Sequence, residues 1–122
     1  MKNYMPVLII GILILLVSSC VQQTYKRTIQ FRVDASNLEE VETMSIRGQM
    51  SPLNWKTNYL LEDVDNDSIY TTEITFDTPF DYVDIKFVKN MDEFELERED
   101  NRRIMFNGMD SIKYYAVFDK NE

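Results

Sequence analysis

The chain has 122 residues, a formal net charge of −8 and no histidine. Without histidine it lacks the commonest general base near neutral pH and the commonest zinc ligand, which argues against Ser-His or Cys-His catalysis and against zinc sites. Its 13 lysines and arginines are scattered among 21 acidic residues, which argues against a nucleic-acid partner. We therefore expect a non-catalytic protein without a cofactor or resident metal.

The N-terminus has the pattern of a secretory signal. A basic start precedes an apolar run over 6–17, and small residues follow it. The run is shorter than the roughly 20 residues of a membrane span. Val17-Ser18-Ser19-Cys20 resembles the bacterial lipobox, in which the cysteine is acylated and becomes the new N-terminus. This resemblance implies a signal peptide over 1–19 and lipidation of Cys20; the alternative is an uncleaved anchor helix with a free thiol.

Either form places the rest of the chain outside the cytoplasm, tied to a membrane of the bacterial envelope. We expect the outer membrane, a lipidated tether over 20–27 and a domain over 28–120. About one hundred residues suit one small domain. The single cysteine is used by the lipid, so no disulfide is expected, and the aromatic side chains must supply much of the core.

Short alternating runs with turn residues between them follow the tether and favour an all-β, antiparallel sandwich or barrel. Asn90-Met91 and Asn107-Gly108 mark hairpins, the second a candidate type I′ turn. No run has a helical period of useful length. The predicted strands cover 28–33, 44–48, 59–61, 69–76, 82–89, 94–97, 103–106 and 112–118.

The only tryptophan, Trp55, lies in the predicted loop over 49–58. A loop position favours partial exposure, and a flat exposed ring suits the C–H face of a pyranose sugar. The alternative is that Trp55 packs inward and plugs the core of the small sandwich.

The order of signals along the domain resembles a known family. Gly48 ends a strand, Pro52-Leu53-Asn54-Trp55 follows, and Ile85-Lys86-Phe87-Val88 precedes Glu95-Leu96-Glu97 and Asn101-Arg102. This order resembles the starch-binding domain, carbohydrate-binding module family 20, and its relative the glycogen-binding module, from Ile29 to Phe118. The resemblance implies an immunoglobulin-like β-sandwich of about seven to eight strands that binds α-glucans, often beside a catalytic domain.

The same resemblance implies a set of sugar-binding residues. Trp55 matches the first ring of the family's platform, and Lys86, Glu97 and Asn101 match its polar contacts. Leu96 stands where the family has its second tryptophan, so half of the platform is missing. Leu38 and Asn66 occupy the neighbourhoods of the tyrosines of the family's second sugar site, which we therefore expect to be absent.

Each polar candidate also has a plainer interpretation. Lys86 alternates with Val83, Ile85 and Phe87, so we expect it to face solvent, either as a ligand contact or as an ordinary surface lysine. Asn101 is also a good turn residue, and Glu97 also fits a solvated strand charge.

Two acidic groups raise other possibilities. Asp63, Asp65 and Asp67 have the opening spacing of a calcium loop, but Ser68 and Ile74 replace its glycine and glutamate, which favours a solvated turn. A second series, Glu93, Glu95 and Glu97, offers paired carboxylates of the kind that glycosidases use. A charged edge strand that resists edge pairing explains this series more simply.

The sequence therefore predicts a non-catalytic, lipid-anchored module that binds an α-glucan or a related polysaccharide or oligosaccharide. The anchoring membrane and an enzyme or envelope protein are the other expected partners. The alternative function is a protein-interaction or envelope-assembly module with a degenerate sugar site. An exposed apolar patch around Leu96, or a fully buried Trp55, would favour that alternative.

Overall fold

The computed structural model describes residues 22–121, so the predicted signal peptide over 1–19 and the predicted lipidation of Cys20 lie outside the described residues. The described part is all-β, as predicted, and it contains no helix that is long and apolar enough to cross a membrane. Its eight strands are β1 (Tyr25–Asp34), β2 (Met44–Gly48), β3 (Tyr59–Leu60), β4 (Ile69–Thr78), β5 (Tyr82–Lys89), β6 (Glu93–Phe94), β7 (Arg102–Met105) and β8 (Ser111–Val117).

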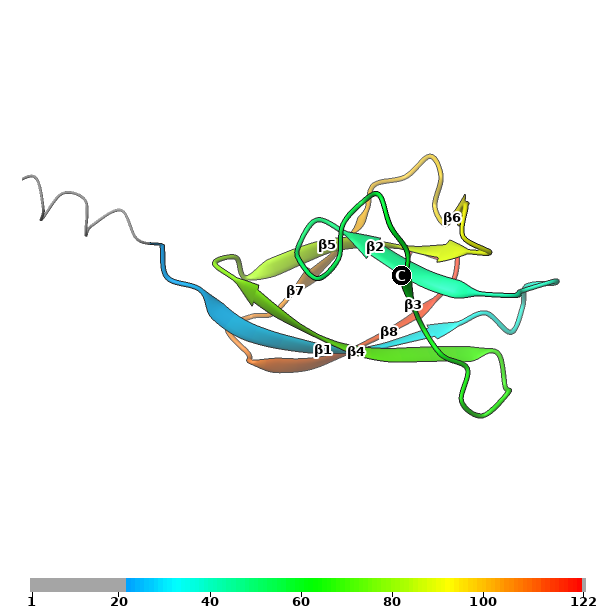
Figure 1. Cartoon of the computed structure of the whole chain (residues 1–122), viewed down its shortest axis with the longest axis horizontal. Helices are drawn as coiled ribbons and strands as arrows, with labels where there is room; N and C mark the ends of the chain where they lie inside the picture. Colours follow the sequence, from blue (N-terminus) through cyan, green and yellow to red (C-terminus); the bar gives the residue numbers. More distant parts are fainter. Residues whose placement is uncertain (1–21, 122) are drawn as a thin grey trace, which may run out of the picture.

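The strands form two sheets packed as a sandwich, which confirms the predicted architecture (Figure 1). One sheet has the order β4-β1-β8. The other has the order β3-β2-β5, and two short strands pair with the edge of β5 that faces away from β2. β6 pairs with the end of β5, and β7 pairs with its beginning. The strand pairs are antiparallel except β1 and β8, which run parallel although we expected an antiparallel sandwich.

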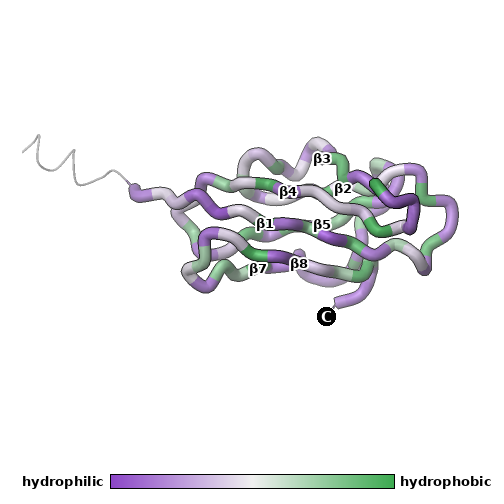
Figure 2. Tube along the Cα trace, turned by 90° about the horizontal axis from the view of Figure 1, so that it is seen from below, coloured by the Kyte–Doolittle hydropathy of each residue, from purple (hydrophilic) through white to green (hydrophobic). Residues whose placement is uncertain are grey.

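The core lies between the sheets because alternate residues of each strand point inward. Phe31 of β1 and Phe87 of β5 are buried and meet edge to face, with ring centroids 6.3 Å apart. The strands run along the length of the domain, and hydrophobic stretches are spread along the trace in short patches (Figure 2). This spread is what alternating strands of a two-layer sandwich produce.

One of the two predicted hairpins is confirmed, because Asn90-Met91 joins β5 to β6 and these strands pair with each other. The hairpin predicted at Asn107-Gly108 is wrong, because this turn joins β7 to β8, which lie in different sheets. Both residues of Asn107-Gly108 and of Asn90-Met91 have positive φ, as a type I′ turn requires. In the acidic turn, the Asp63 carboxylate accepts hydrogen bonds from the backbone N–H groups of Asp67 and Ser68, which supports its interpretation as a turn.

Two strand limits differ from prediction by three residues, and the others agree to within two. β1 begins at Tyr25, earlier than the strand expected from residue 28, because Tyr25 already pairs with Thr78 of β4. The strand expected over 94–97 ends at Phe94, because Leu96 has a φ of 49° and leaves the extended conformation.

Candidate functional site

Trp55 lies in a loop that is anchored at several points. The loop starts beside β5, where the backbone N–H of Gln49 donates to the carbonyl of Asp84. Leu53, two residues before the tryptophan, is buried in the core. The Asn54 side-chain oxygen accepts from the N–H groups of both Lys56 and Thr57, at 2.9 Å each. Because the residues on both sides of Trp55 are tied down, the position of its backbone is fixed.

The Trp55 side chain is 38% exposed, so the alternative in which it plugs the core is wrong. Its backbone carbonyl accepts a hydrogen bond of 2.8 Å from the Arg47 guanidinium. Arg47 belongs to β2 and lies opposite Lys86 of β5. The tryptophan loop is therefore fastened to the outer face of the β2-β5 sheet.

Arg47 is the site residue that sequence reasoning missed. Its Nε donates to the Asn58 side-chain oxygen at 2.9 Å, and its guanidinium carbon lies 5.0 Å from the centre of the Phe94 ring. The signal was present, because Arg47 alternates with the buried Ile46 and Gly48 on a strand that leads directly into the tryptophan loop. Arg47 connects Trp55, Asn58 and Phe94 into one surface.

The prediction that Lys86 faces solvent is wrong. The residue is only 8% exposed, and its Nζ donates to the carbonyl oxygens of Leu96 at 2.8 Å and Glu99 at 3.1 Å. The segment after β6 folds over the outer face of β5 and covers the amine. Lys86 therefore holds this segment in place, with two of its three donors already used.

The interpretation of Glu95 as part of a charged, solvent-facing edge is also wrong. Glu95 is fully buried, and its carboxylate accepts two hydrogen bonds from Arg102 as well as one from the backbone N–H of Phe87. The positive φ of Leu96 breaks the alternation on which the prediction depended. Leu96 itself is 6% exposed, and it lines an open depression with the half-buried Leu38 and Phe94.

Asn101 is exposed and lines an open pocket of about 410 Å³ together with Asp84, Asp100 and Arg103. Asp84 and Arg103 form an exposed two-point ion pair with distances of 2.9 and 3.0 Å. Asp84 also bonds to Gln49 at the start of the tryptophan loop. The Asn101 pocket and the Trp55 loop thus border the same residue, Asp84, at the outer face of β5.

Glu97 is exposed but lines a different depression, together with Leu38, Phe94 and Phe118. Of the four predicted sugar contacts, the structure therefore places Trp55, Lys86 and Asn101 around the outer faces of β2 and β5. It does not bring Glu97 into the Asn101 pocket.

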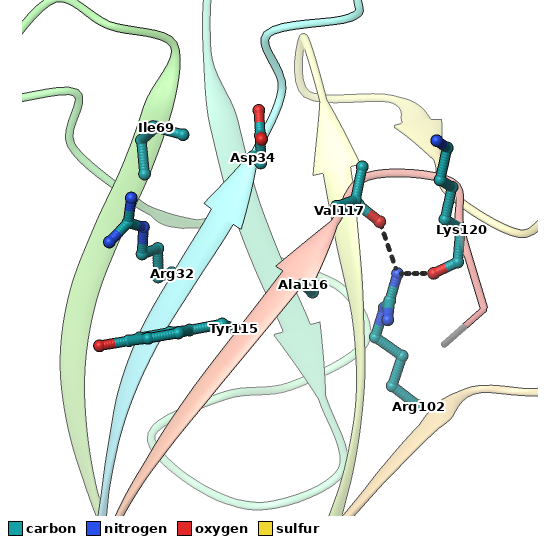
Figure 3. Close-up of a pocket in the computed structure, with 8 residues that line it drawn as sticks. All are labelled: Arg32, Asp34, Ile69, Arg102, Tyr115, Ala116, Val117 and Lys120. Carbon is teal, nitrogen blue, oxygen red and sulfur yellow. Dashed lines mark hydrogen bonds between the residues drawn. The ribbon is translucent and has the colours of Figure 1, made fainter.

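A further pocket, of about 230 Å³, lies beside β1 and β8 (Figure 3). Tyr115 is 61% exposed there, and the Arg32 guanidinium carbon lies 5.4 Å from the centre of its ring. Arg102 closes the other side by donating to the carbonyls of Val117 and Lys120 (Figure 3). Sequence reasoning missed this pocket, because a parallel β1-β8 pair is needed to place Arg32 beside Tyr115.

Within residues 22–121, no group of three or more acidic or cysteine side chains is arranged to hold a metal ion. A scan of the chain against models of protein families finds no match, and a search of curated proteins finds no similar sequence.

Proposed function

We propose that this chain is a non-catalytic sugar-binding module, anchored to the cell envelope, with Trp55 as its platform. The supporting observation is the partly exposed indole in a loop whose two flanks are fixed by Leu53, Asn54 and Arg47. A ring that is already ordered loses little entropy on binding, which favours a weak ligand such as one sugar ring.

The proposed polar contacts follow from where the structure places Asn101, Lys86 and Glu97. Asn101 offers an amide that both donates to and accepts from sugar hydroxyls, in a pocket rimmed by Asp84 and Arg103. Lys86 acts indirectly, because its amine fixes the backbone at Leu96 and Glu99, just before Asn101. Glu97, in its separate depression, would contact only a ligand long enough to reach past the first site.

We propose an α-glucan as the ligand, because the order of motifs resembles starch-binding domains. Covering one indole face contributes about 2 kcal/mol, and two or three polar contacts add about 1 kcal/mol each. Ordering costs subtract from this sum, so we expect a dissociation constant of about 1 mM. Many anchored copies facing one polymer would raise the avidity by about a hundredfold.

The glycosidase interpretation lacks its central residue. Glu95 accepts two hydrogen bonds from Arg102 in a fully buried ion pair, so it is not available to protonate a glycosidic oxygen. The protein-interaction alternative lacks one of its two supporting features, because Trp55 is exposed, although Leu96 lines an open depression with Leu38, Phe94 and Phe118. The sugar-binding proposal is therefore the better supported.

Isothermal titration with maltoheptaose tests the proposal, and the fluorescence of the single tryptophan gives a second readout. We expect heat and a fluorescence change at millimolar ligand, and a loss of at least tenfold in affinity for Trp55→Ala. Tyr115→Ala is the matched control, because it removes an exposed aromatic ring from the other sheet. No binding by the unmodified chain, or equal binding by Trp55→Ala, would refute the proposal.

A further inference from the structure

One end of the sandwich, where β1 begins, has a group of exposed apolar side chains. We name it the apolar end; it consists of Tyr25, Phe80, Met105 and Met109, which are 42–55% exposed. Tyr25 pairs with Thr78 at the end of β4, and Phe80 lies in the turn that follows. Met105 is opposite Tyr82 at the start of β5, and Met109 follows the next turn. Figure 1 shows these strand ends and turns together at the left of the domain.

Arg27 makes this end rigid. Its guanidinium carbon lies 5.1 Å from the centre of the Tyr25 ring, and its NH1 donates to the carbonyl of Met109 at 2.9 Å. It also forms ion pairs with Asp81 at 3.8 Å and Asp110 at 3.5 Å. The two nearest carboxylates are therefore partly neutralised, which reduces the electrostatic cost of bringing this end near an uncharged lipid surface.

The apolar end is also the end at which the expected anchor joins the domain. Cys20 lies five residues before Tyr25, and the apolar run over 6–17 precedes it. Five extended residues span at most about 17 Å. Whether the anchor is a lipid on Cys20 or the apolar run itself, this short connection keeps the start of β1 close to the membrane surface.

We propose that the apolar end rests on the interface of the anchoring membrane, with its four apolar side chains among the lipid headgroups. Exposed apolar groups that cluster in this way mark interaction surfaces, and aromatic side chains are favoured at the boundary between lipid and water. A lipid surface is the occupant that the position favours, because the anchor leaves the domain at this end. The inference depends on anchoring and is independent of sugar binding.

This seating sets the orientation of the binding face. The tryptophan loop between β2 and β3 projects from one layer of the sandwich and does not belong to the end where β1 begins (Figure 1). Val64, which is exposed, lies in the β3-β4 turn beside the far end of β1, where Ile69 pairs with Asp34. Trp55 would thus remain accessible to a polymer, and Val64 would point away from the membrane.

Quenching by brominated phosphatidylcholine tests the seating in the full chain, reconstituted in phosphatidylcholine vesicles. The comparison uses single-tryptophan chains: Phe80→Trp with Trp55→Phe, Val64→Trp with Trp55→Phe, and the native chain. We expect the tryptophan at position 80 to be quenched at least threefold more than the other two. Adding Met105→Gln and Met109→Gln should reduce that quenching by at least half.

The glutamine substitutions separate the apolar surface from the tether, because both methionines are exposed and the anchor is unchanged. A thermal unfolding curve confirms that the double variant remains folded. Equal quenching at positions 80 and 64, or quenching that the glutamines do not alter, would overturn the inference. The inference would also be overturned if bromine did not quench the tryptophan at position 80 and its emission shifted only as the protein-to-lipid ratio rose. That result would assign the apolar end to contact with a second copy of the chain.

Discussion

Arg102 and Glu95 form a two-point ion pair inside the domain, with nitrogen–oxygen distances of 2.7 and 2.8 Å. Arg102 also donates to Tyr114, to the carbonyl of Val117 at the end of β8 and to the carbonyl of Lys120 beyond it. Burial alone would lower the pKa of Arg102, but its hydrogen bonds to Glu95 and Tyr114 raise the pKa above its usual value. The Arg102 guanidinium therefore stays charged, and the pair joins the segment after β6 to the segment after β8.

We predict that Arg102→Met lowers the free energy of unfolding by about 3 kcal/mol, because it leaves the buried Glu95 carboxylate without its charge partner. Urea unfolding measures this change. Arg103→Met is the matched control: Arg103 is next in sequence and has the same two-point contact, with Asp84, but it is exposed. Its midpoint should stay close to that of the unmodified chain. Equal losses in the two variants would contradict the assignment of the buried pair.

We predict that Lys86→Met loosens the segment over 96–100 without unfolding the domain. The substitution preserves much of the side-chain volume but frees the carbonyls of Leu96 and Glu99. Hydrogen exchange should speed up at least tenfold in this segment, and maltoheptaose affinity should fall because Asn101 is no longer held in position. Lys89→Met, which removes only a longer contact of 3.9 Å with Glu93, should leave both unchanged. Normal exchange in Lys86→Met would rule out the positioning role.

We predict that Gly48→Ala displaces the start of the tryptophan loop. A Cβ at this position would lie 2.8 Å from the carbonyl oxygen of Asp84 and 3.0 Å from Cδ1 of Leu53, both closer than van der Waals contact. Because Leu53 anchors the loop, the variant should lose both stability and sugar affinity. Gly108→Ala has a positive φ but open space around it, so it should cost only about 1 kcal/mol and leave affinity intact. Calorimetry and titration separate the two effects.

We predict that Asp34 makes a small contribution to the stability of the fold and that this contribution is lost in acid. Its pKa is lowered mainly by hydrogen bonds from Ser36. A carboxyl group whose pKa is lowered by folding stabilises the folded state at pH values above its unfolded-state pKa of about 3.9. This stabilisation is lost as the pH falls through the folded-state pKa. The melting temperature of Asp34→Asn should therefore be lower than that of the unmodified chain at pH 6, and the difference should narrow as the pH falls below the unfolded-state pKa of about 3.9. A difference that is constant from pH 6 to pH 2 would contradict this account.

The sequence was sufficient to predict most of the strands, because inward and outward residues alternate and turn residues separate the runs. The strand Tyr82–Lys89 has the predicted limits, and Asn107-Gly108 forms the predicted turn. These features depend on neighbouring residues alone, so a local pattern is enough to reveal them.

The candidate site was less predictable because its surroundings come from distant segments. Alternation places Lys86 on the outer face of β5, but it does not show that residues 96–99 cover this face. The left-handed backbone at Leu96, which turns Glu95 inward, has no signal in the residue type, because leucine rarely adopts it. Trp55 was placed correctly in a loop, but its support by Arg47 required the pairing of β2 with β5.

The parallel pairing of β1 with β8 also has a consequence for the export that the proposed anchoring requires. β1 is the central strand of its sheet, yet one neighbour is the last strand, so that Thr28 lies opposite Ser111. During synthesis the first strand has no partner on that side until nearly the whole chain has emerged. A chain that completes this sheet only at the end of synthesis stays unfolded during most of its synthesis. A protein-conducting channel accepts chains in this unfolded state.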